Sequence, residues 1–354
     1  MRVALAGVGL IGGSIGLAAR TRLGAHVVGY NRSPAALELA LERGAIDEAV
    51  MSIDAIGTAD IAIAGVAVDA LPATVRALCE ALPGAVVTDV GSTKAALADA
   101  IESTSFIGGH PLAGAEATGV AHARADLFEG ATWYLTPRAQ TPGVLYERLA
   151  RFVAGLGAVP TAIAPDDHDR LMAVVSHLPH VVANLLVAQA AEALGGETLP
   201  ATGPSFRDAT RVAGSNPALW AQIYTANRDA LGMQIDDLER RLGEVRVLLD
   251  AGDPAALAAW QDSAARQRGA LLQVGLAGAD AGAVQQISTV VPNKPGVVAE
   301  IALALGRAGI NISDMSLAPE ADNRTGMVML WLDPSDAAQA IGLIAALGYP
   351  AAGA

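Results

Sequence analysis

The sequence has little of three things: cysteine, aromatic side chains and positive charge. The single cysteine, Cys79, cannot form an internal disulfide, and the helical pattern from Ala73 to Leu82 predicts that its thiol is a small, buried part of the packing. Aromatic residues make up 4% of the chain, so Ala, Leu, Val and Ile must fill the core. One cysteine and a core of small aliphatic side chains are typical of a cytoplasmic α/β protein.

The shortage of positive charge excludes one class of partner. The chain has 23 basic and 36 acidic residues, a formal net charge of −13, and no cluster of Lys and Arg that would contact phosphates. No nucleic acid is therefore expected as a partner. Polar residues interrupt the richest apolar stretch, Leu171 to Leu194, so no membrane span is expected, and no metal site is predicted.

The chain does contain enough apolar material for several domains. Hydrophobic residues make up 52% of its 354 residues, a length that exceeds one ordinary domain. Residues 1–163 alternate short runs of Val, Ile and Ala with helical patterns, which predicts a Rossmann-type domain with a doubly wound parallel sheet. Its expected strands are Val3–Ala6, His26–Tyr30, Ile61–Val66, Val86–Asp89, Phe106–Gly109 and Trp133–Thr136.

The rest of the chain shows two other patterns. Residues 164–276 are predicted to form an all-helical dimerisation domain, whose apolar faces pack on one another and on a second subunit of a homodimer. Its helices are expected over Asp166–Leu194, Ala218–Leu249 and Pro254–Leu272. After a glycine-rich linker, residues 284–354 follow the order βαββα, with room for a short last strand, which predicts a small α+β module.

A glycine motif lies between the first expected strand and a helix that runs to about Arg22. In a dinucleotide-binding turn the first glycine permits the tight turn, the second lets a pyrophosphate approach the backbone, and the third lets helix and strand pack closely. The N–H groups at the start of the helix then face the phosphates. The context predicts a dinucleotide site formed by Gly7, Val8, Gly9, Leu10, Ile11 and Gly12.

The end of the second expected strand bears on the choice of coenzyme. NAD enzymes usually present Asp or Glu there to the ribose hydroxyls, but this chain has Asn31, Arg32 and Ser33. Asn31 cannot repel a 2′-phosphate, Arg32 can pair with it and Ser33 can hydrogen-bond to it. The three residues favour NADP over NAD; a solvated arginine at a turn is the alternative.

Two further segments begin where strands are expected to end: Asp89–Lys94, which contains Ser92, and Gly108–Glu116. In such sheets ligands bind outside the carboxyl ends of the strands, so both segments are expected to face the coenzyme. Two polar clusters follow in the helical region, Val175–His180 and Phe206–Arg211, with Trp220 shortly after them.

With these motifs in this order, the sequence resembles the prephenate and arogenate dehydrogenase family from the glycine motif to the linker. In that family the ring carbon that bears a hydroxyl loses a hydride to the coenzyme, and the ring carboxylate leaves as carbon dioxide. The resemblance implies that His110 accepts the hydroxyl proton and that Ser92 hydrogen-bonds near the same hydroxyl. A neutral imidazole suits this role near pH 7; a structural histidine beside Pro111 is the alternative.

The resemblance also implies a site for a substrate with two negative charges. It assigns the ring carboxylate to Arg211, whose guanidinium can grip a carboxylate with two hydrogen bonds. The other implied substrate residues are His180, Asp208, Trp220, Glu116 and His177, and His168 also matches a family position. His180 ranks first among the histidines because it resembles the one near the substrate side chain. Packing, capping or surface pairing is the alternative for each.

The sequence departs from the family pattern at two places. Ala115 stands where a hydroxyl residue is frequent, and Pro204-Ser205 replaces a glycine-rich approach to the arginine. Both departures concern the end of the pocket that receives the substrate side chain. Prephenate is therefore favoured only slightly over arogenate.

Residues from 284 onward resemble an ACT domain through Val291–Val297 and Gly309–Asp314. The resemblance implies an amino-acid ligand, tyrosine by the logic of the pathway, bound where backbone N–H groups are accessible. The residues implied for this ligand are Asn293, Gly296, Asn311 and Ile312. Feedback inhibition by tyrosine is expected; a module that only strengthens the oligomer is the alternative.

Two other functions fit parts of the sequence. A hydroxyacid or phosphogluconate dehydrogenase shares a Rossmann domain followed by helices, but it requires a catalytic lysine on an interdomain helix, and the chain has no lysine between Lys94 and Lys294. A nucleotide-bound amino-acid sensor without catalysis would keep the fold but not the chemistry. The presence of His110, Ser92 and Arg211 argues against such a sensor.

Overall fold

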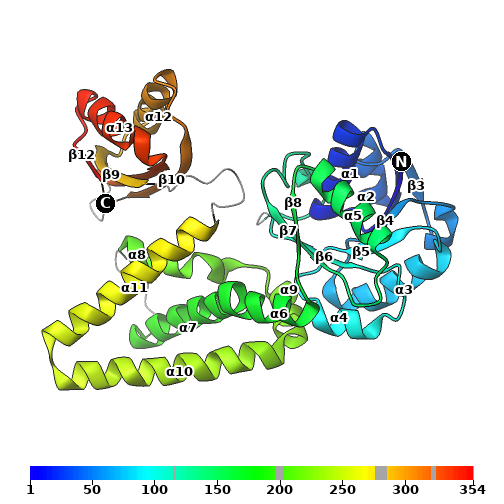
Figure 1. The fold of residues 1–354 in the computed structure, drawn as a ribbon, viewed down its shortest axis with the longest axis horizontal. Coiled ribbons are helices and arrows are strands. Elements are labelled where there is room, and N and C mark those ends of the chain that lie inside the picture. Colours follow the sequence, from blue (N-terminus) through cyan, green and yellow to red (C-terminus); the bar gives the residue numbers. More distant parts are fainter. Residues whose placement is uncertain (115–116, 196–202, 276–284, 320–323, 354) are drawn as a thin grey trace. The chain divides into compact units, whose positions relative to one another are not determined.

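The computed structural model describes the whole chain except residues 115–116, 196–202, 276–284, 320–323 and 354 (Figure 1). The chain divides into two compact units. The first unit comprises Met1–Val181 and Gly214–Arg241, and the second comprises Val182–Ala213 and Leu242–Ala354.

The first unit is built on a five-stranded parallel sheet in the order β3-β2-β1-β4-β5. Its strands are β1 Arg2–Ala6, β2 His26–Tyr30, β3 Glu48–Val50, β4 Ile61–Ala64 and β5 Val86–Asp89. The helices around it are α1 Leu10–Leu23, α2 Pro34–Glu42, α3 Leu71–Ala81, α4 Ala95–Ala100 and α5 Gly143–Gly155, with short 3-10 turns η1 Ile53–Ile56, η2 Val68–Ala70 and η3 Val120–His122. This is the predicted α/β, doubly wound arrangement.

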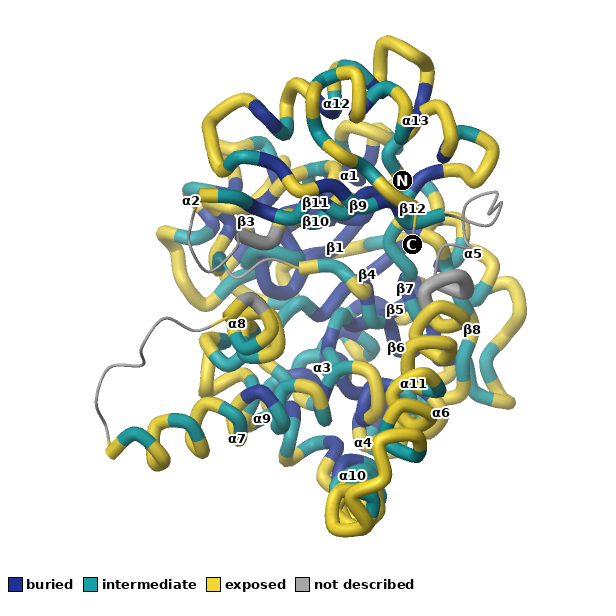
Figure 2. Tube along the Cα trace, turned by 90° about the vertical axis from the view of Figure 1, so that its left-hand side faces the viewer, coloured by how far each residue is buried: buried dark blue, intermediate teal, exposed yellow. Residues whose placement is uncertain are grey.

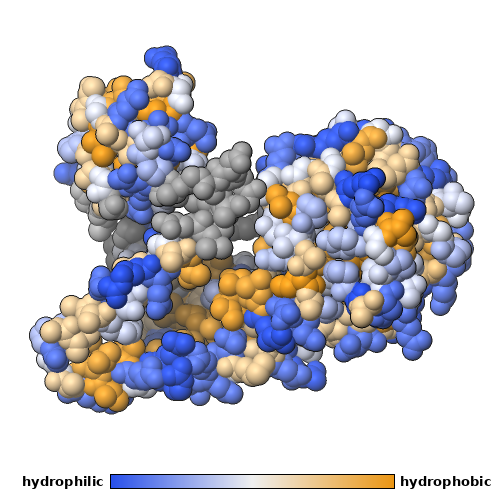
Figure 3. Space-filling model, viewed as in Figure 1, coloured by the Kyte–Doolittle hydropathy of each residue, from blue (hydrophilic) through white to orange (hydrophobic). Residues whose placement is uncertain are grey.

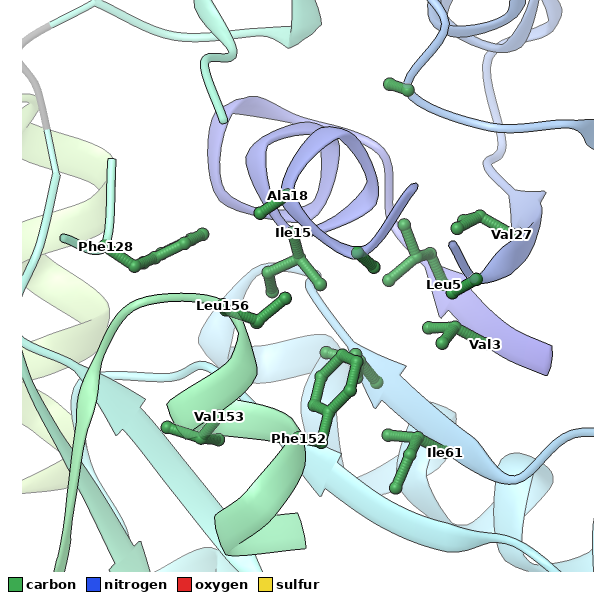
Figure 4. Close-up of a cluster of buried hydrophobic side chains, with 14 of the residues drawn as sticks. Val3, Leu5, Ile15, Ala18, Val27, Ile61, Phe128, Phe152, Val153 and Leu156 are labelled. Atoms are coloured by element: carbon green, nitrogen blue, oxygen red, sulfur yellow. The ribbon is translucent and has the colours of Figure 1, made fainter. Parts of the chain in front are cut away.

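Both faces of this sheet are buried, as the continuous apolar strands predict. Alternate strand residues belong to separate cores: Val3 and Leu5 pack in one cluster, whereas Ala4 and Ala6 pack in another. Figure 4 shows the first cluster, in which Ile15 and Leu156 pack together with the sheet residues. Because side chains alternate along a strand, the two clusters mark the two helix-covered faces.

One expectation about the sheet was wrong. The last expected strands of this domain do form, but they belong to a separate three-stranded sheet: β6 Gly108–Pro111, β7 Thr132–Thr136 and β8 Val159–Ala162. β7 runs antiparallel to β6 and parallel to β8. A parallel return from β6 would require a crossover helix, and the described part of the β6–β7 connection contains only η3. An isolated parallel bridge, Val87–Phe106, joins β5 to the segment just before β6.

The predicted helical region is also present. In the first unit lie α6 Pro165–Met172, a π-helical turn Ala173–His177 and α9 Pro217–Ala226. Two longer helices, α7 Leu178–Ala193 and α10 Arg228–Ala251, begin in the first unit and end in the second. The expected helix Ala218–Leu249 is interrupted at Asn227, which has a φ of −116°. By length and composition the continuous helical stretch Pro165–Ala193 could cross a membrane, yet His168, Asp169 and His177 on it are buried within the protein.

The second unit contains α8 Pro204–Thr210, the turn η5 from Arg211, α11 Pro254–Gly275 and the C-terminal module. The module has β9 Gln285–Pro292, α12 Val297–Arg307, β10 Ile312–Pro319, β11 Thr325–Leu332, α13 Pro334–Ala346 and β12 Ala351–Gly353. Its antiparallel sheet has the order β10-β11-β9-β12. The predicted βαββα order with a short last strand is therefore confirmed. Strand β11 buries every second residue, because helices cover one face of this sheet.

The long helices expose many apolar side chains. Figure 2 shows α10 and α11 as largely exposed, in contrast to the buried strands β1 and β4. Figure 3 shows apolar side chains on the surface of the helical part. The exposed large apolar residues on these helices include Leu185, Val187, Met233, Leu242, Val247, Leu249, Trp260 and Leu271. Patches of this kind mark interaction surfaces.

Candidate active site

The loop between β1 and α1 has the geometry of a dinucleotide-binding turn. Gly7 has a φ of +104°, and its N–H donates to the carbonyl of Tyr30 at 2.8 Å. A Cβ atom on Gly12 would lie 2.0 Å from the Gly7 oxygen, whereas a Cβ atom on Gly9 would meet nothing within 4 Å. Gly12 therefore permits close packing, and Gly9 leaves open space that fits a pyrophosphate group.

The start of α1 supplies the matching electrostatics. Gly9 is the N-cap residue and forms no side-chain cap, and the first turn of this described helix contains no acidic residue. The first N–H groups can therefore donate to an anion. The Val8 side chain is buried in the core, and Leu10 and Ile11 pack against it. At these three predicted residues, the backbone rather than the side chain is therefore available to a ligand.

The turn after β2 is organised by two of the residues considered for coenzyme choice. The Asn31 carbonyl oxygen accepts a hydrogen bond from the Ser33 N–H at 3.0 Å, and the Ser33 hydroxyl accepts one from the Ala36 N–H at 3.3 Å. Ser33 is thus the N-cap of α2. Arg32 lies between them and is exposed. The hydroxyl proton of Ser33 and the guanidinium of Arg32 are compatible with a phosphate ligand at this turn.

A buried carboxylate joins the two strand-end loops that carry Ser92 and His110. One oxygen of Asp89 accepts a hydrogen bond from the Gly91 N–H at 2.8 Å, and the other accepts one from the Gly109 N–H at 3.0 Å. Gly91 and Gly109 immediately precede Ser92 and His110. A Cβ atom on Gly109 would lie 2.6 Å from the Asp89 carbonyl oxygen, so only glycine allows this approach. Asp89 therefore brings both predicted catalytic residues to one edge.

Lys94 completes this junction. Its side chain is fully buried, and its ammonium group donates to the Asp89 carboxylate. Burial lowers the pKa of Lys94, while the charges of Asp89 and Asp169 act in the opposite direction. Such a pair is tolerated in a protein interior when hydrogen bonds satisfy both partners. The two glycine N–H groups provide that satisfaction for Asp89.

His110 lies on β6 and is linked to two residues of α6. Its Nδ1 lies 2.9 Å from Nε2 of His168, and Nδ1 of His168 lies 2.7 Å from Oδ1 of Asp169. The Asp169 carboxylate also accepts hydrogen bonds from the backbone N–H groups of Lys94 at 2.8 Å and Ala95 at 2.9 Å. Asp169 therefore caps the start of α4 from 75 residues away.

The surroundings of His110 keep its imidazole neutral. Burial, and then the positive charges that His168, Lys94 and His177 can carry, hold the pKa of His110 well below its usual range. A neutral imidazole has a lone pair that can accept a proton. His110 is therefore in the protonation state that a base requires at neutral pH.

A second histidine of this unit, His177, is held by the residue that interrupts the expected long helix. The Asn227 side-chain amide donates to Nδ1 of His177 at 3.0 Å and to the carbonyl of Asp169 at 2.8 Å. Burial lowers the pKa of His177 to about 4; Asp169 opposes this shift, and His168 and His180 add to it. His177 is therefore neutral at pH 7.

Trp220 contacts the other two predicted substrate residues of this unit, His177 and His180. Its ring stacks on His180 with the ring centroids 3.4 Å apart, and it lies edge-on to His177 at 6.0 Å. The ring of Tyr224, which the sequence interpretation did not include, lies 5.4 Å from Trp220. The structure thus brings together three of the predicted substrate residues, His177, His180 and Trp220.

Two predicted substrate residues belong to the second unit, and one lies outside the described residues. Asp208 is on α8 and Arg211 begins η5, and both are exposed. Their convergence with His110 stays a prediction. Glu116, like the neighbouring Ala115, lies outside the described residues.

The residues predicted to hold a regulatory ligand lie at the turns of the C-terminal module. Asn293 follows β9, and Gly296 is the N-cap of α12 with a φ of +94°. Asn311 directly precedes Ile312, the first residue of β10. The structure thus places Asn293 and Gly296 between β9 and α12, Asn311 between α12 and β10, and Ile312 at the start of β10. Their ligand stays a prediction.

Sequence interpretation missed Asp169 and Asn227. The run Asp166-Asp167-His168-Asp169 has the polarity of a solvated helix start, and Asp166 and Asp167 are indeed exposed there. His168 and Asp169 turn inward, because the position of α6 against α4 and β7 decides which side chains are buried. The one local signal was the His-Asp pair at the end of that run.

Comparisons with known proteins show the family of the chain. Residues 15–161 match the model of the prephenate dehydrogenase nucleotide-binding domain, residues 164–262 match that of the prephenate dehydrogenase dimerization domain, and residues 286–348 match the ACT domain. The prephenate dehydrogenase of Bacillus subtilis is 31% identical over 353 residues, which cover 94% of this chain and 92% of that protein.

Two solved structures are similar as well. The prephenate dehydrogenase of A. aeolicus, crystallised with hydroxyphenyl propionate and NAD+, is 29% identical with a TM-score of 0.70 and covers 76% of this chain and 97% of its own. The arogenate dehydrogenase of Synechocystis is 31% identical with a TM-score of 0.68 and covers 76% of this chain and 99% of its own. The resemblance inferred from the motifs is confirmed: this chain belongs to the prephenate dehydrogenase family and carries a C-terminal ACT domain.

Proposed function

We propose that this chain oxidises prephenate to 4-hydroxyphenylpyruvate and carbon dioxide in tyrosine biosynthesis, with NAD or NADP as the coenzyme. The observation that supports this proposal most directly is the neutral, half-buried His110 at the strand edge that Asp89 shares with the Ser92 loop. The proposal places the enzyme in the cytoplasm as a homodimer, whose interface covers the exposed apolar side chains of the long helices.

The chemistry requires a base at the ring hydroxyl. When bound, the nicotinamide accepts the hydride that leaves the hydroxyl-bearing ring carbon. His110 accepts the hydroxyl proton, and Ser92 hydrogen-bonds to the same oxygen and keeps it oriented. The bond between the ring and its carboxylate then breaks, carbon dioxide leaves, and the electron pair completes the aromatic ring as a phenolate. The phenolate oxygen takes the proton back from His110, which gives 4-hydroxyphenylpyruvate and the neutral imidazole.

The two carboxylates of prephenate require fixed partners. We assign the ring carboxylate to Arg211, with Asp208 orienting that arginine. The side chain of the substrate is assigned to His180, with His177 nearby and Glu116 at the entrance. The aromatic wall of Trp220, stacked on His180, suits the flat cyclohexadiene ring.

The test of this function is product identification with the purified full-length chain. Prephenate and coenzyme should give an absorbance increase at 340 nm, one molecule of carbon dioxide per turnover and 4-hydroxyphenylpyruvate on chromatography. Arogenate is the second candidate substrate, because the arogenate dehydrogenase of Synechocystis is as similar as the prephenate enzymes. Tyrosine as the product from arogenate, with no turnover of prephenate, would establish that alternative.

For the coenzyme we propose NADP. Arg32 and Ser33 offer a cation and a hydroxyl where an acidic residue would repel the 2′-phosphate. Arg32→Ala should raise KM for NADP about tenfold, the effect of roughly 1.4 kcal/mol, and change KM for NAD by less than about twofold. A lower KM for NAD than for NADP in the unaltered chain would contradict this preference.

For regulation we propose tyrosine as the effector, bound at Asn293, Gly296, Asn311 and Ile312. Coupling of about 1–3 kcal/mol between this site and the active site is usual for allostery. Asn311→Ala in the full chain should raise the tyrosine concentration for half-inhibition about tenfold, while turnover without tyrosine stays unchanged. Inhibition that keeps its unaltered tyrosine dependence in this variant would contradict the assignment.

A further inference from the structure

A chain of hydrogen bonds connects His110 through His168 to the carboxylate of Asp169. Nδ1 of His110 faces Nε2 of His168 at 2.9 Å, and Nδ1 of His168 faces Asp169 at 2.7 Å. The side chain of His168 is fully buried, and the two imidazole rings meet edge to face with their centroids 5.1 Å apart. Tyr134, which pairs with His110 across β6 and β7, also lies edge-on to His168 at 5.7 Å.

The chemistry of these groups fixes where the protons lie. The Asp169 carboxylate accepts hydrogen bonds from the backbone N–H groups of Lys94 and Ala95, so both of its oxygens act as acceptors. His168 must therefore donate its Nδ1 proton to Asp169. In a neutral His168 this leaves a lone pair on Nε2, and His110 must then donate from Nδ1. The lone pair of His110 is thereby assigned to Nε2.

We propose that His168, held by Asp169, is a positioning residue for His110 that makes Nε2 of His110 the atom that accepts the substrate proton. The inference rests on the proposed dehydrogenase function. It goes beyond that function because it names the accepting nitrogen and the two residues that select it. Neither His168 nor Asp169 needs to contact the substrate for this role.

The same chain stabilises the product of the proton transfer. When Nε2 of His110 takes the hydroxyl proton, the ring becomes positively charged and still donates from Nδ1 to His168. His168 in turn donates to Asp169, whose negative charge lies at the end of the chain. Such an arrangement resembles the histidine and aspartate of a catalytic triad, with one additional imidazole between them.

Asp169 also fixes the loop of Ser92. Lys94 and Ala95, whose N–H groups it accepts, follow Ser92 by two and three residues. One carboxylate thus sets both the orientation of the His110 ring and the start of α4. A shift of Asp169 would disturb the base and the Ser92 loop together.

The first experiment reads the protons directly. The full-length chain, labelled with ¹⁵N-histidine, has six histidines, and single His→Gln variants assign their signals. Above pH 7, His110 and His168 should both carry their proton on Nδ1, whereas histidine in water favours Nε2. In His168→Leu, His110 should revert to the Nε2–H form. A proton on Nε2 of His110 in the unaltered chain, or a doubly protonated His168, would overturn the inference.

The second experiment separates positioning from folding. His168→Leu should lower kcat for prephenate about 100-fold, within the range of general-base contributions, while KM for substrate and coenzyme changes less than about threefold. His168→Gln keeps an acceptor oxygen near the Nε2 position and should recover about tenfold of that loss. Unchanged kcat in His168→Leu would overturn the inference, as would equal losses in both variants.

Asp169→Asn gives a third measurement. When the asparagine amide nitrogen faces Nδ1 of His168 it donates to that atom, which reverses the proton positions along the chain and places a proton on Nε2 of His110. The same amide can no longer accept both backbone hydrogen bonds from Lys94 and Ala95. Reversal of this kind in a catalytic triad lowers kcat by about 10⁴-fold; here we expect at least about 100-fold. His122→Leu, at an exposed histidine, is the matched control and should leave kcat unchanged.

The proposed function and this inference can fail separately. If the unaltered chain turns over neither prephenate nor arogenate, the proposed function fails, and the ¹⁵N spectra still decide whether His168 sets the proton of His110. If the chain is active but the spectra show the Nε2–H form at His110, the function stands and the inference fails.

Discussion

The two compact units of this protein differ in the side chains that they bury. Among the described residues, the first unit buries ten polar or charged side chains, including Asp89, Lys94, His168, Asp169 and His177, whereas the second unit buries one, Thr289. The C-terminal module relies instead on an apolar cluster that includes Ile301, Leu305 and Leu330. Burial of polar groups costs free energy unless each group is paired. The difference teaches that buried polar and charged side chains are concentrated in the unit that holds the proposed catalytic residues.

The largest effect is expected at His110. His110→Asn removes the base but leaves the dinucleotide turn intact, so kcat should fall about 10³-fold while the affinity for coenzyme changes less than about twofold. Steady-state rates and coenzyme titration by fluorescence measure the two quantities. The exposed His122→Asn is the control. A residual kcat above about a tenth of the unaltered value would show that His110 is not the essential base.

Breaking the buried ion pair of Lys94 and Asp89 should lower the free energy of unfolding of the first unit. Lys94→Met leaves the Asp89 carboxylate buried without its cation, and removal of one partner of a buried pair costs about 3–5 kcal/mol. Urea unfolding followed by tryptophan fluorescence measures this loss. Lys294→Met, at an exposed lysine of the C-terminal module, should change the free energy of unfolding by less than about 0.5 kcal/mol. Similar losses in both variants would contradict the claim that the buried charged pair stabilises the first unit.

His177 should give the first unit a pH-dependent stability. Its pKa falls from 6.5 to about 4 on folding, so between these values the unfolded chain binds more protons than the folded one. Its contribution is therefore complete above about pH 6.5 and is lost as the pH falls to about 4, with a total on the order of 3 kcal/mol. His177→Gln should flatten this dependence in urea unfolding at several pH values. An identical pH slope in both proteins would contradict this origin.

Local patterns in the sequence were sufficient for much of the fold. The glycines at positions 7, 9 and 12, the strands β1, β2, β4 and β5, and the βαββα order of the module all follow from residues near one another in the chain. The short strands β3 and β8 were missed, because β3 has three residues and β8 contains Pro160. The separation of β6 and β7 from the main sheet depends on the chain's return path, which no local pattern encodes.

The candidate site was predictable only in part for the same reason. His110, Ser92 and the group around Trp220 follow from motifs at strand and helix ends. The contacts of Asp169 with Lys94 and of His168 with His110 join residues 75 and 58 positions apart, and they arise only when α6 packs beside β6 and α4. The approach of Arg211 to His110 stays a prediction.

The pH dependence of kcat/KM for prephenate tests the central claim most directly, because this quantity reports the free enzyme's essential base. His110 must be neutral to act, and its pKa lies well below 6.5 because of burial and the neighbouring His168, Lys94 and His177. The value of kcat/KM should therefore stay level from pH 8 down past 6.5 and fall only at lower pH. A loss of activity that is half complete at pH 7 or above, as the pH is lowered, would contradict the account.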